Sequence, residues 1–168
     1  MDKPDFIDNI KAFKATGLTF EAANPRFDLI DAVVRLTDRV PDLRVVLGHL
    51  PALALPTEPA ALKKYENTLR ELRKRNVYAK LSALMKRGEE QRDPAAYKPM
   101  LDFMWDIFGE DRVVYAGGWP GPLSKMKAEL TILQAYFGAK GREASEKFFW
   151  KNSVPAFRWV KREPGQPG

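Results

Sequence analysis

The sequence predicts an α/β protein with a parallel sheet, because amphipathic helical segments alternate with short apolar segments along the chain. Four of the apolar segments have the length and composition of strands, and a helical segment separates each from the next. The chain has 168 residues, whereas a complete eight-fold (β/α) barrel needs roughly 200 to 250 or more. The residues alone therefore leave two architectures open, a four-stranded open α/β sheet or half of a barrel.

The first half of the chain contains two of the predicted helix–strand pairs. Apolar residues at helical spacing predict a helix over residues 5–15, and Gly17 ends it as a C-terminal cap glycine commonly does. The short apolar segment 18–22 is predicted to be a strand. A second amphipathic helix begins near Phe27 and must end before Pro41, and residues 43–47 form a buried strand.

The second half continues the same alternation. The predicted elements are a helix over 60–75, a strand over 77–81, a helix over 97–108, a strand over 112–116, and helical segments over 126–137 and 144–150. Residues 138–141, with glycine at both ends, are predicted to interrupt the helical structure between the last two helices. We place one folded domain at residues 1–160, and we expect the Pro- and Gly-rich tail at 161–168 to be frayed.

Composition excludes several classes of protein. Cysteine is absent, so the chain has no disulfide, no thiol nucleophile and no zinc–thiolate cluster. No run of about 18 apolar residues exists that could cross a membrane, and the start of the chain lacks a secretory signal, so we expect a cytoplasmic protein. The net charge is +6, but the densest basic stretch, residues 63–75, has glutamates interleaved on a predicted solvent face. We therefore favour a solvated outer helix, and electrostatic binding of nucleic acid is the weakest function left open, because it rests on net charge alone.

The only histidine of the chain, His49, follows directly after the predicted strand 43–47. The carboxyl ends of parallel strands form the functional face of α/β folds, so an imidazole there can bind a divalent metal, polarise a carbonyl or move a proton. A lone histidine is equally compatible with a purely structural role. A metal site needs three or four ligands; Glu21, near the end of the first strand, is a candidate, although a surface role fits it too.

A second candidate region follows the fourth predicted strand. Gly117 and Gly118 permit close approach of the backbone, and Trp119-Pro120 forms a rigid apolar lip beside them. A turn that cradles a phosphate and a purely structural turn both fit this pattern.

Four segments carry motifs that occur together in one family. They are PDLRVVLGHL at 41–50, NVYAKLSA at 76–83, FGEDRVVYAGGWP at 108–120 and FWKNSVPAF at 149–157. In this order they resemble the amidohydrolase-related family that contains sugar lactonases and 2-pyrone-4,6-dicarboxylate lactonase. The resemblance spans roughly residues 17–160. It implies a partial (β/α) TIM barrel of the amidohydrolase type, its C-terminal part, and a metal-dependent hydrolase that uses zinc or manganese in the parent family.

The resemblance also implies roles for individual residues. His49 matches a histidine that binds metal or substrate, and Ser82 with Lys80 falls on a strand end that faces the substrate. Lys86 or Arg87 would then contact a substrate carboxylate, and we add Trp119 to the substrate-binding residues. The implied substrate is a small lactone or related cyclic ester.

Two features of the family pattern are missing. The catalytic aspartate of the family's "GSDWP" motif, which accepts a proton from the attacking water, falls on Gly118. The early His-x-His pair has no counterpart. We therefore expect an inactive, truncated product of a longer gene, with no metal bound in this chain. Because four strands cannot close a small barrel, half of a barrel would expose two sheet edges and an apolar interior. We therefore expect the chain to flatten into an open sheet, to pair with another copy, or to depend on a missing N-terminal half.

Overall fold

The computed structural model describes residues 3–23, 26–51, 55–85, 93–117, 122–159 and 163–165. Its centre is one sheet of four parallel strands in the order β1-β2-β3-β4. The strands are β1 (Phe20–Ala22), β2 (Val45–Pro51), β3 (Val77–Ser82) and β4 (Val113–Tyr115). Each strand pairs with its neighbour in the sequence, so the predicted repetition of strand and helix is confirmed.

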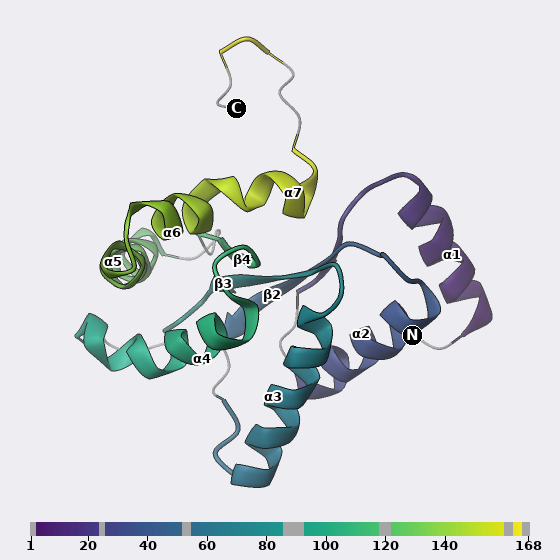
Figure 1. Cartoon of the computed structure of the whole chain (residues 1–168), viewed down its shortest axis with the longest axis horizontal. Helices are drawn as coiled ribbons and strands as arrows, with labels where there is room; N and C mark the ends of the chain where they lie inside the picture. Colours follow the sequence, from purple (N-terminus) through teal and green to yellow (C-terminus); the bar gives the residue numbers. More distant parts are fainter. Residues whose placement is uncertain are drawn as a thin grey trace.

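Helices connect the strands. They are α1 (Pro4–Ala15), α2 (Phe27–Arg39), α3 (Pro59–Arg73), the short 3₁₀ helix η1 (Pro94–Tyr97), α4 (Lys98–Phe108), α5 (Leu123–Ala139), α6 (Arg142–Glu146), the π-helical turn η2 (Lys147–Lys151) and α7 (Ser153–Phe157). In Figure 1, α2, α3 and α4 lie below the sheet and α7 lies above it. No described helix is both long enough and apolar enough to cross a membrane.

The main core lies between one face of the sheet, called here the first face, and the helices that pack against it. Alternate strand residues point into this core, and they pack against apolar side chains of α2, α3, α4 and α5. The strand residues are Val45, Leu47, Val77, Ala79, Leu81 and Val113, all at most 2% exposed. Strand alternation therefore turns the intervening residues toward the opposite face.

The second face of the sheet is covered by α7. Val46, Tyr78 and Val114 form a separate buried cluster with Ala156 of that helix. The hydroxyl of Thr19, just before β1, donates to the carbonyl of Ala156 at 2.7 Å and fixes the helix across the sheet. The apolar side chains of this cluster are therefore not exposed, because the chain folds α7 onto that face of the sheet (Figure 1).

Strand β2 extends to Pro51, so His49 lies within the strand and not after it as predicted. The register of β2 against β3 is irregular at this point. Leu47 pairs with Ala79 and Leu50 pairs with Leu81, so β2 holds one extra residue between these two pairs. This arrangement is a β-bulge, which bends a strand and redirects its side chains. The helix break predicted over residues 138–141 is confirmed, since α5 ends at Ala139 and Gly141, at φ 104°, directly precedes α6.

Candidate functional site

Four polar side chains gather where β1, β2 and β3 approach their carboxyl ends. They are Glu21, His49, Lys80 and Ser82. Glu21 pairs in register with Val46, which in turn pairs with Tyr78, and Lys80 and Ser82 follow Tyr78 at alternate positions. Glu21, Lys80 and Ser82 thus share the second face of the sheet, beyond the apolar cluster that α7 covers.

The first interaction in this cluster is an ion pair between Lys80 and Glu21, whose side chains hydrogen-bond directly. Lys80 is 14% exposed and Glu21 is 37% exposed, so the ammonium is the more buried partner. A Cβ atom at Gly48 would lie 3.0 Å from Cα of Ala23 and 3.1 Å from Oε1 of Glu21. Glycine at this position is what allows β1 and the ion pair to approach β2 so closely.

The second interaction joins His49 to Ser82. Nδ1 of the imidazole lies 3.1 Å from Oγ of Ser82. Ser82 is fully buried, whereas His49 is partly exposed. His49 has φ 61° and Ala83, next to Ser82, has φ 53°. Such left-handed conformations are uncommon in residues other than glycine, and they are enriched at functional sites.

The structure therefore brings His49, Lys80 and Ser82 together, while their roles remain predictions. It places the hydroxyl of Ser82 against the imidazole and away from solvent. Lys86, Arg87, Gly118 and Trp119 lie outside the described residues. Gly48 is not among the residues predicted for the site, although a glycine directly before a histidine at a strand end indicates close backbone approach.

The described residues do not fit a divalent metal. No group of three or more His, Cys, Asp and Glu side chains converges anywhere in the described part of the chain. The one carboxylate of the cluster, Glu21, is already paired with the ammonium of Lys80, whose positive charge opposes a metal cation. What the cluster offers a ligand is an imidazole and an ammonium group, which suit acceptor oxygens. The hydroxyl of Ser82 is buried against the imidazole.

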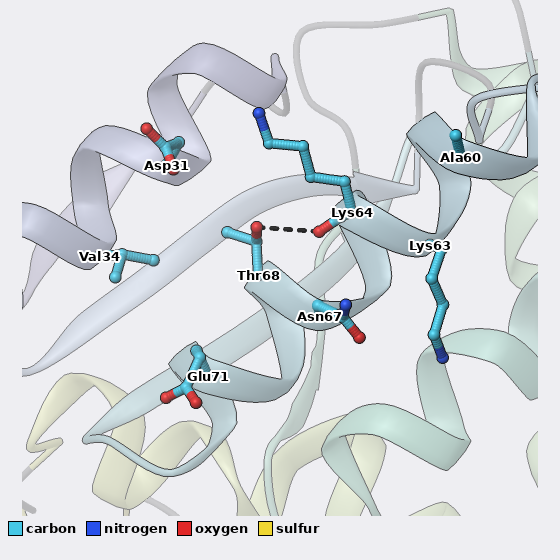
Figure 2. A pocket seen from close by; sticks show the side chains of 8 residues that line it. All are labelled: Asp31, Val34, Ala60, Lys63, Lys64, Asn67, Thr68 and Glu71. Atoms are coloured by element: carbon cyan, nitrogen blue, oxygen red, sulfur yellow. Dashed lines mark hydrogen bonds between the residues drawn. The ribbon is translucent and has the colours of Figure 1, made fainter.

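Two surface hollows lie among the outer helices and involve none of these residues. One, of about 540 Å³, is lined by residues of α2 and α3 (Figure 2). The other, of about 330 Å³, lies between η1, α4 and α5.

Basic residues of α3 pair with glutamates of the same helix, as Lys63 and Arg70 do with Glu66. This helix therefore presents mixed charge.

Comparison with known proteins identifies the family. The family model described as "Amidohydrolase" matches residues 11–159. The chain belongs to the amidohydrolase family. A search of curated proteins finds no match.

Solved amidohydrolase structures share the fold. "Amidohydrolase 2" from Bifidobacterium longum subsp. infantis is 23% identical, with a TM-score of 0.69, and the match covers 93% of this chain and 56% of that one. An amidohydrolase from Burkholderia multivorans, in a structure with bound HEPES, is 21% identical with a TM-score of 0.76, over 95% and 59% of the two chains. A zinc-bound structure of a Burkholderia multivorans amidohydrolase gives 20% identity and a TM-score of 0.75, with the same coverage.

The chain thus spans somewhat over half the length of the solved amidohydrolases it matches, and it has the fold of a partial TIM barrel of that type. In a (β/α) barrel the helices surround the sheet and the other sheet face turns inward. The second face of this sheet, with Glu21, Lys80 and Ser82, is the inward face. The cluster also lies at the carboxyl ends of the strands, where catalytic residues of barrel enzymes are found.

Proposed function

We propose that this amidohydrolase chain supplies the substrate-binding residues of a hydrolase for a small lactone or related cyclic ester. The observation that carries the proposal is the pairing of His49 with Ser82 beside the Lys80–Glu21 ion pair, at the carboxyl edge of the inward sheet face. A partly buried ammonium group and an imidazole favour a ligand that has a carbonyl or carboxylate oxygen.

Each residue has a defined task in this proposal. His49 contacts the oxygen of the scissile carbonyl or of a substrate carboxylate. Lys80 stabilises negative charge on the ligand, and Glu21 holds the ammonium group in place. Hydrolysis also needs a base that takes a proton from the attacking water. The family's aspartate falls on Gly118, so we propose that the isolated chain binds the lactone without hydrolysing it.

A divalent metal, zinc or manganese, belongs to the parent family by resemblance, and zinc is bound in one of the matched structures. The described residues of this chain supply no set of ligands for it. Our proposal therefore assigns binding of the substrate to Lys80 and His49 and assigns no metal to the isolated chain.

Ligand binding and turnover test this proposal separately. The purified chain is titrated with a carboxylated γ-lactone by calorimetry, and hydrolysis is followed with and without Zn²⁺ or Mn²⁺. We expect binding without turnover, and an affinity lowered about tenfold or more in Lys80→Met and His49→Ala, which is roughly 1.4 kcal/mol. Lys127→Met, an exposed lysine of α5, is the matched control. Binding that neither site variant changes would sink the proposed site, and turnover by the unaltered chain would contradict its inactivity.

A second candidate is a non-catalytic subunit or remnant that retains the fold, which Gly118 in place of the family's aspartate favours. Among the described strands, β1 and β4 each have one unpaired edge, to which another copy or a further polypeptide segment could add strands. Sedimentation of the purified chain distinguishes the possibilities. A dimer supports self-association, and a monomer that binds no lactone supports the remnant.

A further inference from the structure

We infer that Ser82 is a positioning residue that fixes the tautomer of His49, with the proton on Nε2. The inference concerns the same site as the proposed function. Only one part of it, that a ligand contacts Nε2, rests on the proposed function. The tautomer itself follows from the burial and hydrogen bonding of two side chains.

The argument begins with the hydroxyl of Ser82. This side chain is fully buried, and its Oγ lies 3.1 Å from Nδ1 of His49. A serine hydroxyl has one proton to donate, and a buried donor without an acceptor is costly. Among the described residues, Nδ1 of His49 is the one hydrogen-bond partner of the Ser82 hydroxyl. The arrangement that satisfies the buried proton is therefore Oγ–H donating to an unprotonated Nδ1.

The neutral imidazole carries one proton, so an unprotonated Nδ1 places that proton on Nε2. Were Nδ1 to carry the proton and donate it to Ser82, the hydroxyl proton of Ser82 would need a second acceptor, and the described residues provide none. Ser82 thus selects between the two tautomers without touching the ligand itself.

The backbone holds both partners in the required geometry. The bulge in β2 inserts one extra residue between Leu47 and Leu50, and His49 adopts φ 61° there. On the neighbouring strand, the chain turns at Ala83, with φ 53°, directly after Ser82. One left-handed residue, His49, is thus itself a partner in the hydrogen bond, and the other, Ala83, directly follows the second partner. Each conformation costs free energy that the surrounding structure must offset.

This tautomer distinguishes two roles that are open to a histidine, donation to a ligand oxygen and binding of a metal ion. Nε2–H is a donor, so it suits an acceptor oxygen of the ligand. A metal ion needs the lone pair of a neutral imidazole nitrogen, and in this tautomer Nε2 has none to offer. The placement of Lys80 and Glu21 as an ion pair beside the imidazole agrees with a cluster built for an oxygen ligand.

Because His49 is the only histidine, nuclear magnetic resonance reports it without assignment ambiguity. The chain is labelled with ¹⁵N-histidine, and long-range ¹H–¹⁵N spectra are recorded at pH of about 9, where an ordinary imidazole is neutral. We expect one tautomer, with Nδ1 at the unprotonated and Nε2 at the protonated position. Ser82→Ala should move both nitrogens toward the averaged positions of a free histidine, and Ser82→Thr, which keeps the hydroxyl, should restore the single tautomer.

Three outcomes overturn the inference. One is a proton on Nδ1 in the unaltered chain, which is decisive even if Ser82→Ala fails to fold. Another is an unchanged imidazole spectrum in a folded Ser82→Ala variant, checked by circular dichroism. The third is a shift of Nε2 to a metal-bound position on addition of equimolar Zn²⁺. None of these readouts depends on lactone binding, so failure of the proposed function would leave the tautomer test intact.

Discussion

The ammonium group of Lys80 on β3 reaches across β2 to the carboxylate of Glu21 on β1, and Gly48 is the residue over which they meet. A Cβ at this position would lie 3.4 Å from Cε of Lys80 and 3.0 Å from Cα of Ala23. The lysine side chain can move, whereas the backbone at Ala23 continues directly from β1. Strand spacing and the ion pair therefore both depend on glycine at position 48.

Gly48→Ala should lower the free energy of unfolding by about 1–3 kcal/mol, because the added methyl group overpacks a contact that the backbone cannot relieve. Urea denaturation measures the change. The matched control is Gly138→Ala in α5, where an added Cβ meets nothing within 4 Å; it should stabilise the helix by about 0.5–1 kcal/mol. Equal effects of the two substitutions would show that the contact at Gly48 is unimportant.

Asn152 connects the C-terminal helices to β4. Its Nδ2 donates to the carbonyl of Glu110 at 2.6 Å and to that of Val113 at 2.8 Å, and the side chain is 5% exposed. Asn152→Ala removes the donor from both carbonyls and should cost about 2–3 kcal/mol in urea denaturation. Asn67→Ala, on the exposed side of α3, should change stability by less than about 0.5 kcal/mol. A small loss at Asn152 would mean that water replaces the amide.

The local pattern of the sequence was sufficient for most of the fold. The strand predicted at 77–81 is β3, and the helix predicted at 60–75 is α3, within two residues at either end. Both depend on near neighbours in the chain, through apolar runs and helical spacing. The bulge at Gly48–His49 was not predictable in this way, because it exists only relative to the register of β3.

The candidate site was predictable as a set of residues and not as a set of contacts. His49 and Ser82 are 33 positions apart, and each was singled out by its own motif. Their hydrogen bond, and the burial that makes Ser82 a partner of the imidazole, arise from strand pairing. The same limit applies to Ala156, whose role on the inward face depends on the path of the chain after η2.

Acid should weaken the contacts of Glu146 at the end of α6. Hydrogen bonds from Lys151 and Arg142 lower the pKa of this carboxyl from 4.5 to about 2. A depressed pKa in the folded state stabilises the protein above pH 4.5, and this contribution disappears as the pH falls toward 2. Unaltered protein should therefore have a higher Tm than Glu146→Gln at pH 6, and the difference should vanish near pH 2.

The partner of Glu146 provides the control for this prediction. In a Lys151→Met background the substitution Glu146→Gln should have a smaller effect at pH 6, because the largest contributor to the lowered pKa is already gone. A Tm difference that stays constant from pH 6 to 2 would contradict the assignment, since an uncharged packing effect does not depend on protonation.

The packing of α7 against the inward face of the sheet depends on one small residue, Ala156. Ala156 is fully buried against Val46, Tyr78 and Val114. Ala156→Glu would place a charge among three apolar side chains, and we expect a loss of about 3 kcal/mol or more together with increased binding of a hydrophobic dye. Phe157→Glu, at a side chain that is 41% exposed, should cost less than about 1 kcal/mol. If the two variants unfold at the same urea concentration, α7 does not hold the inward face closed, and that face must be covered in another way.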